Sequence, residues 1–461
     1  MGVDGLYKFI NTNCPYVYKN VYIKNIKKKI CIIDGIQHIY SQLIYMRTKN
    51  KEVYTVDGKN ISHIHGLINS LSYYLKNRII PIFIFDGKSP DIKKKKIEER
   101  RLILKNNLKK LKDLENARTN ALNDYMKMKS NDDKSGDEFS KYFFGTPPES
   151  MLMTDDKCSG GSCSGSGSGS CSCSCSGSDG SGEDEGDDTA YIRNKITLKV
   201  DDLNNEYHKI YKKSIILKDY YVKDWIEILE LLGLPVIRAE NEADPVCSYL
   251  LKNNKHIYGI ISDDSDMLIF GADRLMRKLV NQTFKTIELD YLIETIKYDL
   301  LQLENNDDFT LDDLINFCIL LGTDYGNFNL KIKYDNSLEM LKYYYSVNKN
   351  ISQIINECEL SKFDEIKKYY TCNGSGGDSI YSYIDPKLLH SKPEWNKPKL
   401  MELKKRLLEL HVDEDYIDES NLHLDECYSY YNNSKHYVYK NKFTFFNYNK
   451  GFTRFNDNVY N

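Results

Sequence analysis

The chain has 461 residues, a hydrophobic content of 41%, a mean hydropathy of -0.56 and a formal net charge of -3. It contains no apolar run of the roughly 20 residues that span a bilayer, and its first ten residues lack the basic start and apolar middle of a signal peptide. These features exclude a membrane-spanning protein and predict a soluble, intracellular protein that is not secreted and is long enough to bury a sizeable core.

The charges and the cysteines are unevenly distributed. Residues 131–190 carry 3 basic and 13 acidic residues, a net -10 that leaves the rest of the chain, out of a total of -3, at +7. A mildly basic body permits a nucleic-acid partner. Of the 12 cysteines, five lie within the same acidic tract and the others are scattered. That distribution favours a reducing compartment over a disulfide framework.

The first hundred residues alternate apolar strands with helices. The run Ile30–Ile33 predicts a strand that ends on Asp34, and the run Ile79–Phe85 predicts a strand that ends on Asp86. Acids at the ends of such strands favour an α/β fold with a mostly parallel central sheet flanked by helices, whose ligands bind beyond the carboxyl ends of the strands. The spacing of apolar residues predicts two helices between these strands, at Ile39–Arg47 and Ser62–Leu75.

A basic helix and a low-complexity tract follow. Lys93–Lys129 is expected to be a charged helix that begins with four successive lysines, although such a run is also typical of a solvated helix face. Residues 130–190 are rich in Ser, Gly and acidic side chains and cannot build a core, so we expect them to be disordered. Their alternating cysteines, without histidine, do not form a zinc pattern. A helical pattern resumes near Tyr191 and runs to Gly233.

A central segment places two pairs of acids on either side of a short apolar strand. Glu242 and Asp244 precede a helical pattern, for which Asp244 is a candidate N-cap. Asp264 and Asp266 follow the strand Ile257–Ile261 and, being two residues apart in extended chain, are expected to share a face. Asp after a strand also serves in caps and turns. Four carboxylates on neighbouring element ends nevertheless repel one another unless a hard cation compensates them, which predicts half of a metal site.

The last third of the chain is expected to be mainly helical. Leu311–Leu321 is predicted to be a helix, and the Gly322-Thr323-Asp324 sequence after it supplies a seventh acid. The segment His436–Asn461 shows no clear period. Two further helices are predicted, at Lys331–Tyr345 and Pro398–Leu410.

Together these segments resemble the flap endonucleases of the xeroderma pigmentosum group G (XPG) nuclease family, over most of residues 1–110 and 212–420. The resemblance rests on the order and spacing of MGVDGL, CIIDG with IYSQLIYMR, PIFIFDGKSPDIKKKKIEERR, LLGLPVIRAENEAD, DDSDMLIFG and CILLGTDYG, with a weaker echo in KPEWNKPKLMELKKRLLEL. It implies a PIN-like nuclease fold with a helical cap or arch and a C-terminal helix-two-turn-helix region.

The resemblance also implies a division of the chain. An N-terminal nuclease region is expected at residues 1–107, and a helical cap at 108–220, interrupted by the low-complexity insert. An internal nuclease region with a segment like a helix-two-turn-helix is expected at 221–345. A C-terminal helical region and an irregular tail are expected at 346–461.

The family's metal-binding acids fall on seven positions of this chain. The first four would mainly hold one Mg²⁺ ion and the last three another, and Mn²⁺ could replace either, because oxygen-only ligands suit these ions. Two such ions can activate a water and stabilise the leaving oxygen of a phosphodiester. The basic pair that reaches the scissile phosphate in the family falls on Lys93 and Arg100. The seven acids are Asp34, Asp86, Glu242, Asp244, Asp264, Asp266 and Asp324.

Further residues match positions on the family's DNA path. For Gly2, Arg47 and His63, an ordinary helix surface is the alternative. The remaining members lie at the acidic centre or in the stretch that follows it. The full set of predicted DNA-binding residues is Gly2, Arg47, His63, Glu242, Gly322, Asp324, Lys331 and Lys333.

The chain departs from the family pattern in three places. Asp244 stands where the family usually has Glu, so this ligand is one methylene shorter. The stretch Asn329–Tyr334 lacks the turn glycines with which the family grips duplex phosphate around a potassium ion, so duplex contacts should depend more on lysine side chains. The tail lacks a Gln-led motif for binding a sliding clamp, which leaves a clamp partner uncertain.

The expected function is a Mg²⁺-dependent, structure-specific 5′ nuclease that cleaves 5′ flaps or 5′ ends of branched DNA in replication and repair. We expect a monomer that binds flapped DNA and no membrane, in a nucleus or a viral replication factory. The alternatives are a 5′ exoribonuclease, a junction-resolving nuclease or 5′ exonuclease of the same superfamily, and a DNA-binding scaffold without activity. The scaffold is disfavoured because all seven ligand positions are acidic.

Overall fold

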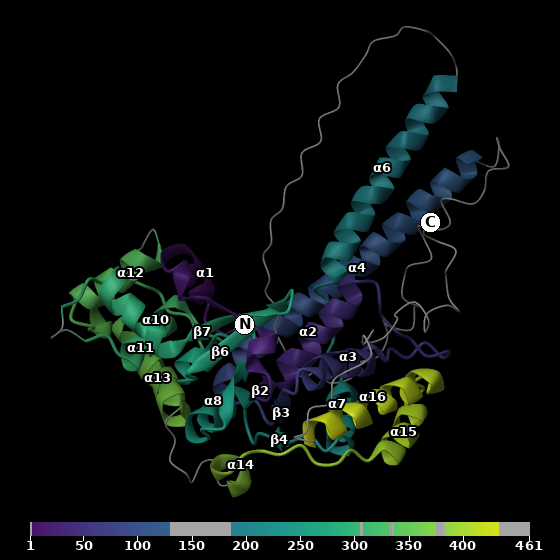
Figure 1. The fold of residues 1–461 in the computed structure, drawn as a ribbon. Helices are drawn as coiled ribbons and strands as arrows, with labels where there is room; N and C mark the ends of the chain where they lie inside the picture. The colour runs from purple at the N-terminus through teal and green to yellow at the C-terminus, as the bar shows by residue number, and fades with distance from the viewer. Residues whose placement is uncertain are drawn as a thin grey trace.

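A computed structural model describes residues 2–129, 186–304, 308–331, 333, 336–374, 381 and 383–432. At its centre lies a seven-stranded sheet in the order β1-β7-β6-β5-β2-β3-β4 (Figure 1). Strands β6, β5, β2, β3 and β4 are parallel, whereas β7 runs antiparallel to both of its neighbours. The expected fold class, a mostly parallel sheet flanked by helices, is confirmed. The strands are β1 Lys19–Tyr22, β2 Ile30–Asp34, β3 Ile80–Phe85, β4 Val236–Arg238, β5 Ile257–Ile261, β6 Arg274–Val280 and β7 Thr283–Glu288.

The middle strands are buried along their whole length. Every residue of β2 and β3 is buried, and their sequences ICIID and IPIFIF are almost entirely apolar. Ile32 of β2 lies in register with Ile82 on one side and with Ile260 on the other. Continuous β-branched and aromatic residues are typical of a parallel sheet that is covered on both faces. This rigid sheet fixes where the ends of its strands lie.

Two groups of helices flank the sheet (Figure 1). Helices α2 and α3 pack against β3, and α7, α15 and α16 extend this group. Helix α8 packs against β2, β3 and β5, and α13 joins α8 to α11. The helices are α1 Leu6–Asn13, α2 Gly35–Thr48, α3 Ser62–Lys76, α7 Asp219–Leu231, α8 Ala243–Asn253, α9 Asp266–Ile269, α10 Leu289–Thr295, α11 Leu311–Leu321, α12 Ser337–Ser346, α13 Leu360–Gly374, α14 Pro386–His390, α15 Leu400–Glu409 and α16 Glu414–Asn432.

Helices α4 (Lys94–Lys129) and α6 (Gly186–Tyr211) form a long pair that projects from the body (Figure 1). Leu111, Leu114 and Tyr207 make a small apolar core between them, separate from the main core. The Arg118 guanidinium lies 4.7 Å from the centre of the Tyr207 ring. The expected charged helix after residue 93 is confirmed. Helix α6 begins at Gly186, so the last five residues of the insert, 186–190, are helical and not disordered as expected. The rest of that insert lies outside the described residues.

The base of this helix pair is held by one arginine. Helix α6 ends at Tyr211, so the expected continuous helix to Gly233 is wrong. Arg47 Nη1 donates to the carbonyl oxygens of Tyr211 and Ser214, at 2.7 and 3.2 Å, and the guanidinium lies 3.9 Å from the centre of the Tyr211 ring. Glu52 accepts from Arg47 Nε at 3.2 Å and from the Tyr211 hydroxyl at 2.8 Å. A cation on the free carbonyls at a helix C-terminus favours termination there.

The region after α11 differs from its prediction. The helix expected from Lys331 begins only at Ser337, because the Asn336 side chain accepts from the backbone N–H groups of Leu338 and Glu339, each at 3.0 Å. The helix predicted at Pro398–Leu410 is confirmed as α15. The segment His436–Asn461 lies outside the described residues, and the domain boundaries stay predictions. In the part of the chain that the structure describes, no helix is both long and apolar enough to cross a membrane.

Candidate active site

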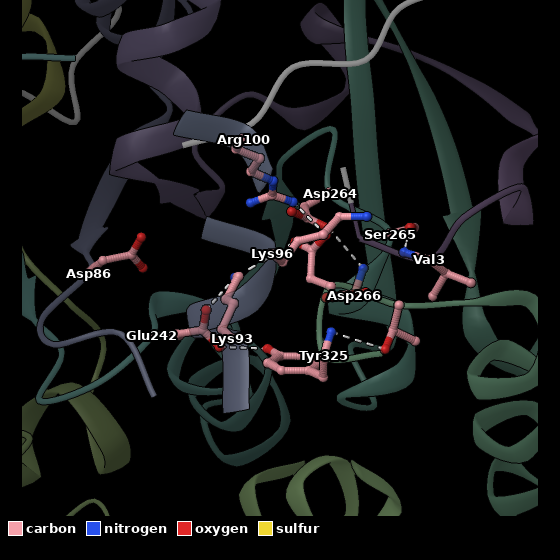
Figure 2. A network of polar contacts seen from close by, with 12 residues as sticks. Val3, Asp86, Lys93, Lys96, Arg100, Glu242, Asp264, Ser265, Asp266 and Tyr325 are labelled. Atoms are coloured by element: carbon pink, nitrogen blue, oxygen red, sulfur yellow. Dashed lines mark hydrogen bonds and ion pairs between the residues drawn. The ribbon is translucent and has the colours of Figure 1, made fainter. Parts of the chain in front are cut away.

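Acidic side chains gather at the carboxyl edge of the parallel sheet. Asp34 is the last residue of β2, Asp86 directly follows β3, and Asp264 follows β5. Carboxyl ends of parallel strands meet at one edge, so these acids lie together as predicted. Glu242 and Asp266 face the same centre (Figure 2). Asp244 lies within electrostatic reach of Asp264, Asp34 and Asp86, and Asp324 within reach of Asp264 and Asp266.

Backbone N–H groups orient several of these carboxylates. Asp34 Oδ1 accepts from Gln37 N at 3.1 Å, as the N-cap of α2. Asp86 Oδ1 accepts from Ala243 N at 2.7 Å, which ties the end of β3 to the start of α8. Helix α8 begins at Ala243 with Glu242 as its N-cap residue, so the prediction of Asp244 as N-cap is wrong.

The pair after β5 converges by a turn and not by strand geometry. Asp264 lies in the connection after β5, and Asp266 is the first residue of α9. Asp264 Oδ1 accepts from Asp266 N at 3.1 Å, and Ser262 Oγ accepts from Asp264 N at 3.0 Å. Both acids still face the centre, because this short hydrogen-bonded turn replaces the extended chain that we expected.

The clustering makes ionisation of these acids unfavourable. Burial, together with the negative charge of Asp86, raises the pKa of Asp34 to about 8. Burial and the charge of Asp264 raise the pKa of Asp244 and of Asp266 well above the usual range. Burial also raises the pKa of Asp264, against the opposing charge of the chain's amino terminus. The centre therefore requires positive charge to hold these carboxylates in the ionised form.

Lys93 and Arg100 supply part of that charge. Lys93 Nζ forms an ion pair with Glu242 Oε1 and lies 3.8 Å from Asp324 Oδ2. Arg100 Nη2 donates to Asp324 Oδ1 at 2.5 Å. Burial lowers the pKa of Lys93, but the carboxylates of Glu242, Asp324 and Asp244 outweigh it, so this pKa is raised and the ammonium stays charged. The structure thus brings the two predicted catalytic cations to the predicted acids.

The donor set fits a hard divalent cation. Both carboxylate oxygens of Asp266 lack a hydrogen-bond partner among the described residues, although the side chain is only 1% exposed. Oxygen-only donors of this kind suit Mg²⁺ or Mn²⁺. No three carboxylates of the described residues are spaced to hold one ion as they stand, and two of the acids, Glu242 and Asp324, pair with Lys93 and Arg100. The chemistry fits, and some of these side chains must move to bind an ion.

The amino-terminal segment closes one side of the centre. Gly2 has φ 80, and a Cβ there would lie 2.3 Å from Asp264 Oδ1 and 2.7 Å from Asp266 N, so only glycine fits. Val3 N donates to Ser265 Oγ at 2.9 Å, and Asp4 N donates to the carbonyl oxygen of Gly322 at 2.8 Å. Gly2 and Gly322 are therefore both at the centre, where the resemblance implied.

Two of the predicted DNA-binding residues are buried in the protein. Arg47 holds the end of α6, as described above, and is 9% exposed. His63 is fully buried, and its Nε2 lies 3.0 Å from Asp224 Oδ2. Asp224 also accepts from Arg406 Nη2 at 3.1 Å. These contacts give Arg47 and His63 structural roles, and a DNA contact by either stays a prediction without support in the structure.

The two predicted DNA-binding lysines after the centre are exposed. Lys331 Nζ donates to the carbonyl oxygen of Ser352 at 2.6 Å, so its ammonium group makes a hydrogen bond within the protein. Lys333 is exposed and lies in the short described stretch between two gaps. Neither contact with DNA is tested by the structure, and both stay predictions.

Sequence reasoning missed two tyrosines that contact Glu242. Glu242 Oε2 accepts from the Tyr325 hydroxyl at 2.5 Å and from the Tyr369 hydroxyl at 2.7 Å. Tyr325 follows Asp324 directly, so its position in the motif could have been noticed. Tyr369 is on α13, 127 residues away from Glu242, and no local pattern indicated it.

The fold and the site together define an α/β protein with a buried acidic centre at the carboxyl edge of its sheet, beneath the base of a basic helix pair. Two family models match the regions that build this centre. The XPG N-terminal domain matches residues 1–107, and the XPG I-region matches residues 233–324. Both XPG domain matches fall on the segments whose motifs carry the resemblance, and they confirm it.

The chain is similar to several flap endonucleases. Flap endonuclease 1-A of Sorghum bicolor is 24% identical over 326 residues, covering 70% of this chain and 62% of that protein. Flap endonuclease 1 of Theileria parva is 25% identical over 374 residues, covering 80% of this chain and 56% of that protein. The matches thus span about three fifths of these relatives' own length. The structure of flap endonuclease-1 from Methanococcus jannaschii is 19% identical, with a TM-score of 0.49, over 90% of this chain and 96% of that chain.

Proposed function

We propose that this chain is a Mg²⁺-dependent, structure-specific 5′ nuclease that hydrolyses phosphodiesters at 5′ flaps and 5′ ends of branched DNA. The observation that carries the proposal is the convergence of seven acids and two cations at one edge of the sheet, at the base of the α4–α6 pair. The two XPG domain matches and the names of the similar proteins support the same activity.

The acids divide into two candidate ligand sets. Asp34 ends β2, Asp86 follows β3, and Glu242 and Asp244 lie at the start of α8; these four would mainly hold one ion. Asp264, Asp266 and Asp324 would hold the other. Bound divalent ions would activate a water and stabilise the leaving oxygen of the phosphodiester. Asp244 is one methylene shorter than the usual Glu, so its carboxylate reaches less far into the centre.

Lys93, directly before α4, and Arg100 of α4 have a second role in this proposal. Lys93 and Arg100 each stand against a carboxylate, at the point where α4 meets the sheet. A phosphate that enters the centre offers them a competing anion. Two preorganised cations beside a reacting phosphate stabilise the charge that develops in the transition state. The close approach of Gly2 to Asp264 and Asp266 keeps side chains out of the space beside these acids.

The biological setting is part of the proposal. We infer branched or flapped DNA as the partner, action in replication and repair, and a monomeric enzyme in the nucleus. The similar proteins named above come from cellular organisms and give no support to a viral replication factory. The tail, which lacks a Gln-led clamp-binding motif, lies outside the described residues.

The test is cleavage by the purified chain with Mg²⁺ on single-flap, double-flap and nicked DNA. We expect cleavage at the base of the 5′ flap and no cleavage in EDTA. A four-way junction and 5′-phosphorylated RNA, assayed beside them, separate the alternatives. Preference for the junction would indicate a resolving nuclease, and preference for RNA an exoribonuclease. No Mg²⁺-dependent cleavage of any of these substrates would leave the non-catalytic scaffold.

A further inference from the structure

Glu242 has a different set of partners on each of its two carboxylate oxygens. Oε2 accepts hydrogen bonds from the Tyr325 hydroxyl at 2.5 Å and the Tyr369 hydroxyl at 2.7 Å. Oε1 faces Lys93 Nζ. The side chain of Glu242 is 6% exposed, so water has little access to either oxygen. One oxygen is thus held by neutral donors and the other by a cation.

We propose that Tyr369 is a positioning residue for Glu242, which it restricts to binding a cation through Oε1 alone. The proposal rests on the proposed function, because it concerns the acid that the family pattern assigns to a divalent ion. Tyr369 lies on α13, outside both segments that the family models match. Its role is therefore a feature of how this chain folds and not of the shared motifs.

The physical argument is one of acceptor capacity and rotation. A carboxylate oxygen has about two acceptor directions, and the two phenols use both of those on Oε2. The carboxylate group therefore cannot rotate without losing two hydrogen bonds, each to a charged acceptor. Oε1 is the only oxygen left, and Lys93 already stands there. A divalent ion at Glu242 must take Oε1 from Lys93, which frees Lys93 for the phosphate.

The surroundings of Tyr369 keep its hydroxyl in place as a donor. Its ring packs against Tyr325 at a centroid distance of 4.7 Å and against Phe270 at 6.0 Å. From this position the Tyr369 hydroxyl donates to Glu242 Oε2 at 2.7 Å. Without that hydroxyl, Tyr325 alone would hold Oε2, and Glu242 could turn this oxygen towards Lys93 at the cost of one hydrogen bond instead of two. The tighter ion pair would then compete better against a divalent ion.

The experiment compares Tyr369→Phe with Tyr370→Phe in the full chain. Both tyrosines are on α13 and pack among the same rings, but Tyr370 forms no hydrogen bond with Glu242 in the structure described. Mn²⁺ affinity is measured without DNA, by electron paramagnetic resonance of free Mn²⁺, and single-flap cleavage gives kcat and KM. We expect Tyr369→Phe to lower Mn²⁺ affinity by roughly 10–100-fold and to lower kcat with KM for DNA unchanged. Tyr370→Phe should leave both the Mn²⁺ affinity and kcat within about threefold of the wild type, because it removes no hydrogen bond to Glu242.

A double-mutant cycle separates positioning from a general structural effect. Glu242→Gln weakens Mn²⁺ binding by itself, and adding Tyr369→Phe should then have almost no further effect on the remaining affinity. An equal loss in both backgrounds would overturn the proposal, and so would a Tyr369→Phe variant indistinguishable from Tyr370→Phe in an active wild-type background. A wild type that neither binds Mn²⁺ nor cleaves DNA would overturn the proposed function, and this inference with it.

Discussion

Arg100 of α4 donates to Oδ1 of Asp324 at 2.5 Å, although the two residues are 224 positions apart in the chain. The contact ties the base of the projecting helix pair to the acidic centre of the sheet. Lys93, at the start of the same helix region, pairs with Glu242 and lies near Asp324 as well. The position of α4 therefore depends on the charges that the acids carry.

Removing either cation should slow cleavage with little loss of DNA affinity. Lys93→Ala or Arg100→Ala is expected to lower the single-turnover rate on a 5′ flap by roughly 10²–10³, the usual cost of losing one preorganised electrostatic contact. The control is Lys95→Ala, because Lys95 is exposed on the same helix. If Lys95→Ala slowed cleavage equally, only general basicity of α4 would matter.

Asp266→Asn should abolish turnover with Mg²⁺. Both oxygens of Asp266 lack hydrogen-bond partners among the described residues, so the carboxylate is available to an ion, and the amide cannot replace its charge. Flap binding in Ca²⁺ should stay within a few-fold, because the phosphate contacts lie elsewhere. Asp263→Asn is the matched control, since Asp263 lies 3.6 Å from Arg277 Nε, outside the predicted ligand set. Cleavage above a few per cent of wild type in Asp266→Asn would contradict the ligand assignment.

Stability of the metal-free chain should fall as the pH rises. Because the pKa of Asp34 is about 8 in the folded chain and about 4 in the unfolded chain, the folded state holds a proton that the unfolded state has lost. The stabilisation by this group is complete below pH 4 and is lost by about pH 8, at up to about 1.4 kcal/mol per pH unit. The measurement is denaturant unfolding in EDTA. As the pH rises from 6.5 to 8, the free energy of unfolding of the wild type should fall relative to that of Asp34→Asn.

Mg²⁺ provides the second half of that pH experiment. Saturating Mg²⁺ compensates the charge of the carboxylates, so it should stabilise the wild type more at pH 8 than at pH 5.5. With Mg²⁺ at pH 8, the wild type should therefore be more stable than Asp34→Asn. A wild type whose stability relative to Asp34→Asn did not change between pH 6.5 and 8 in EDTA would show that Asp34 is already ionised in the folded chain without a metal.

Arg47 should act on the helix pair and not on DNA. Arg47→Ala removes hydrogen bonds to the carbonyl oxygens of Tyr211 and Ser214 and leaves the partly buried Glu52 carboxylate with fewer donors. We expect a loss of about 2–3 kcal/mol in stability and faster hydrogen exchange in the last turns of α6. Lys213→Ala, at an exposed neighbouring position, is the control. Unchanged exchange in α6, with about one unit less salt dependence of duplex binding, would instead make Arg47 a phosphate contact.

Duplex binding should depend on the lysines that follow the acidic centre. Lys331→Ala and Lys333→Ala are each expected to weaken binding and to reduce its salt slope by roughly one unit. Lys27→Ala, before β2 at the amino edge of the sheet, should leave the slope unchanged. The chain lacks the usual turn glycines here, so K⁺ should have no effect beyond ionic strength. Tighter binding in K⁺ than in Na⁺ at matched ionic strength would contradict this account.

The sequence alone determined the sheet and most of the acidic centre. The runs before Asp34, Asp86 and Asp264 are almost entirely apolar, which is typical of parallel strands covered on both faces. Once such strands run parallel, their carboxyl ends share an edge. The convergence of the acids therefore follows from strand type and direction, and needs no knowledge of how individual side chains pack.

Only the tertiary structure decided which residues support that centre and which are buried away from it. Tyr369 reaches Glu242 because α13 packs against α8. His63 is buried and does not reach the surface, because it pairs with Asp224 of α7. Arg47 contacts the end of α6 because packing brings the carbonyl oxygen of Tyr211, 164 residues away in the chain, within hydrogen-bond distance of its guanidinium. Local patterns report the period and polarity of one segment, whereas hydrogen-bond partners from segments more than a hundred residues apart exist only after the chain has packed.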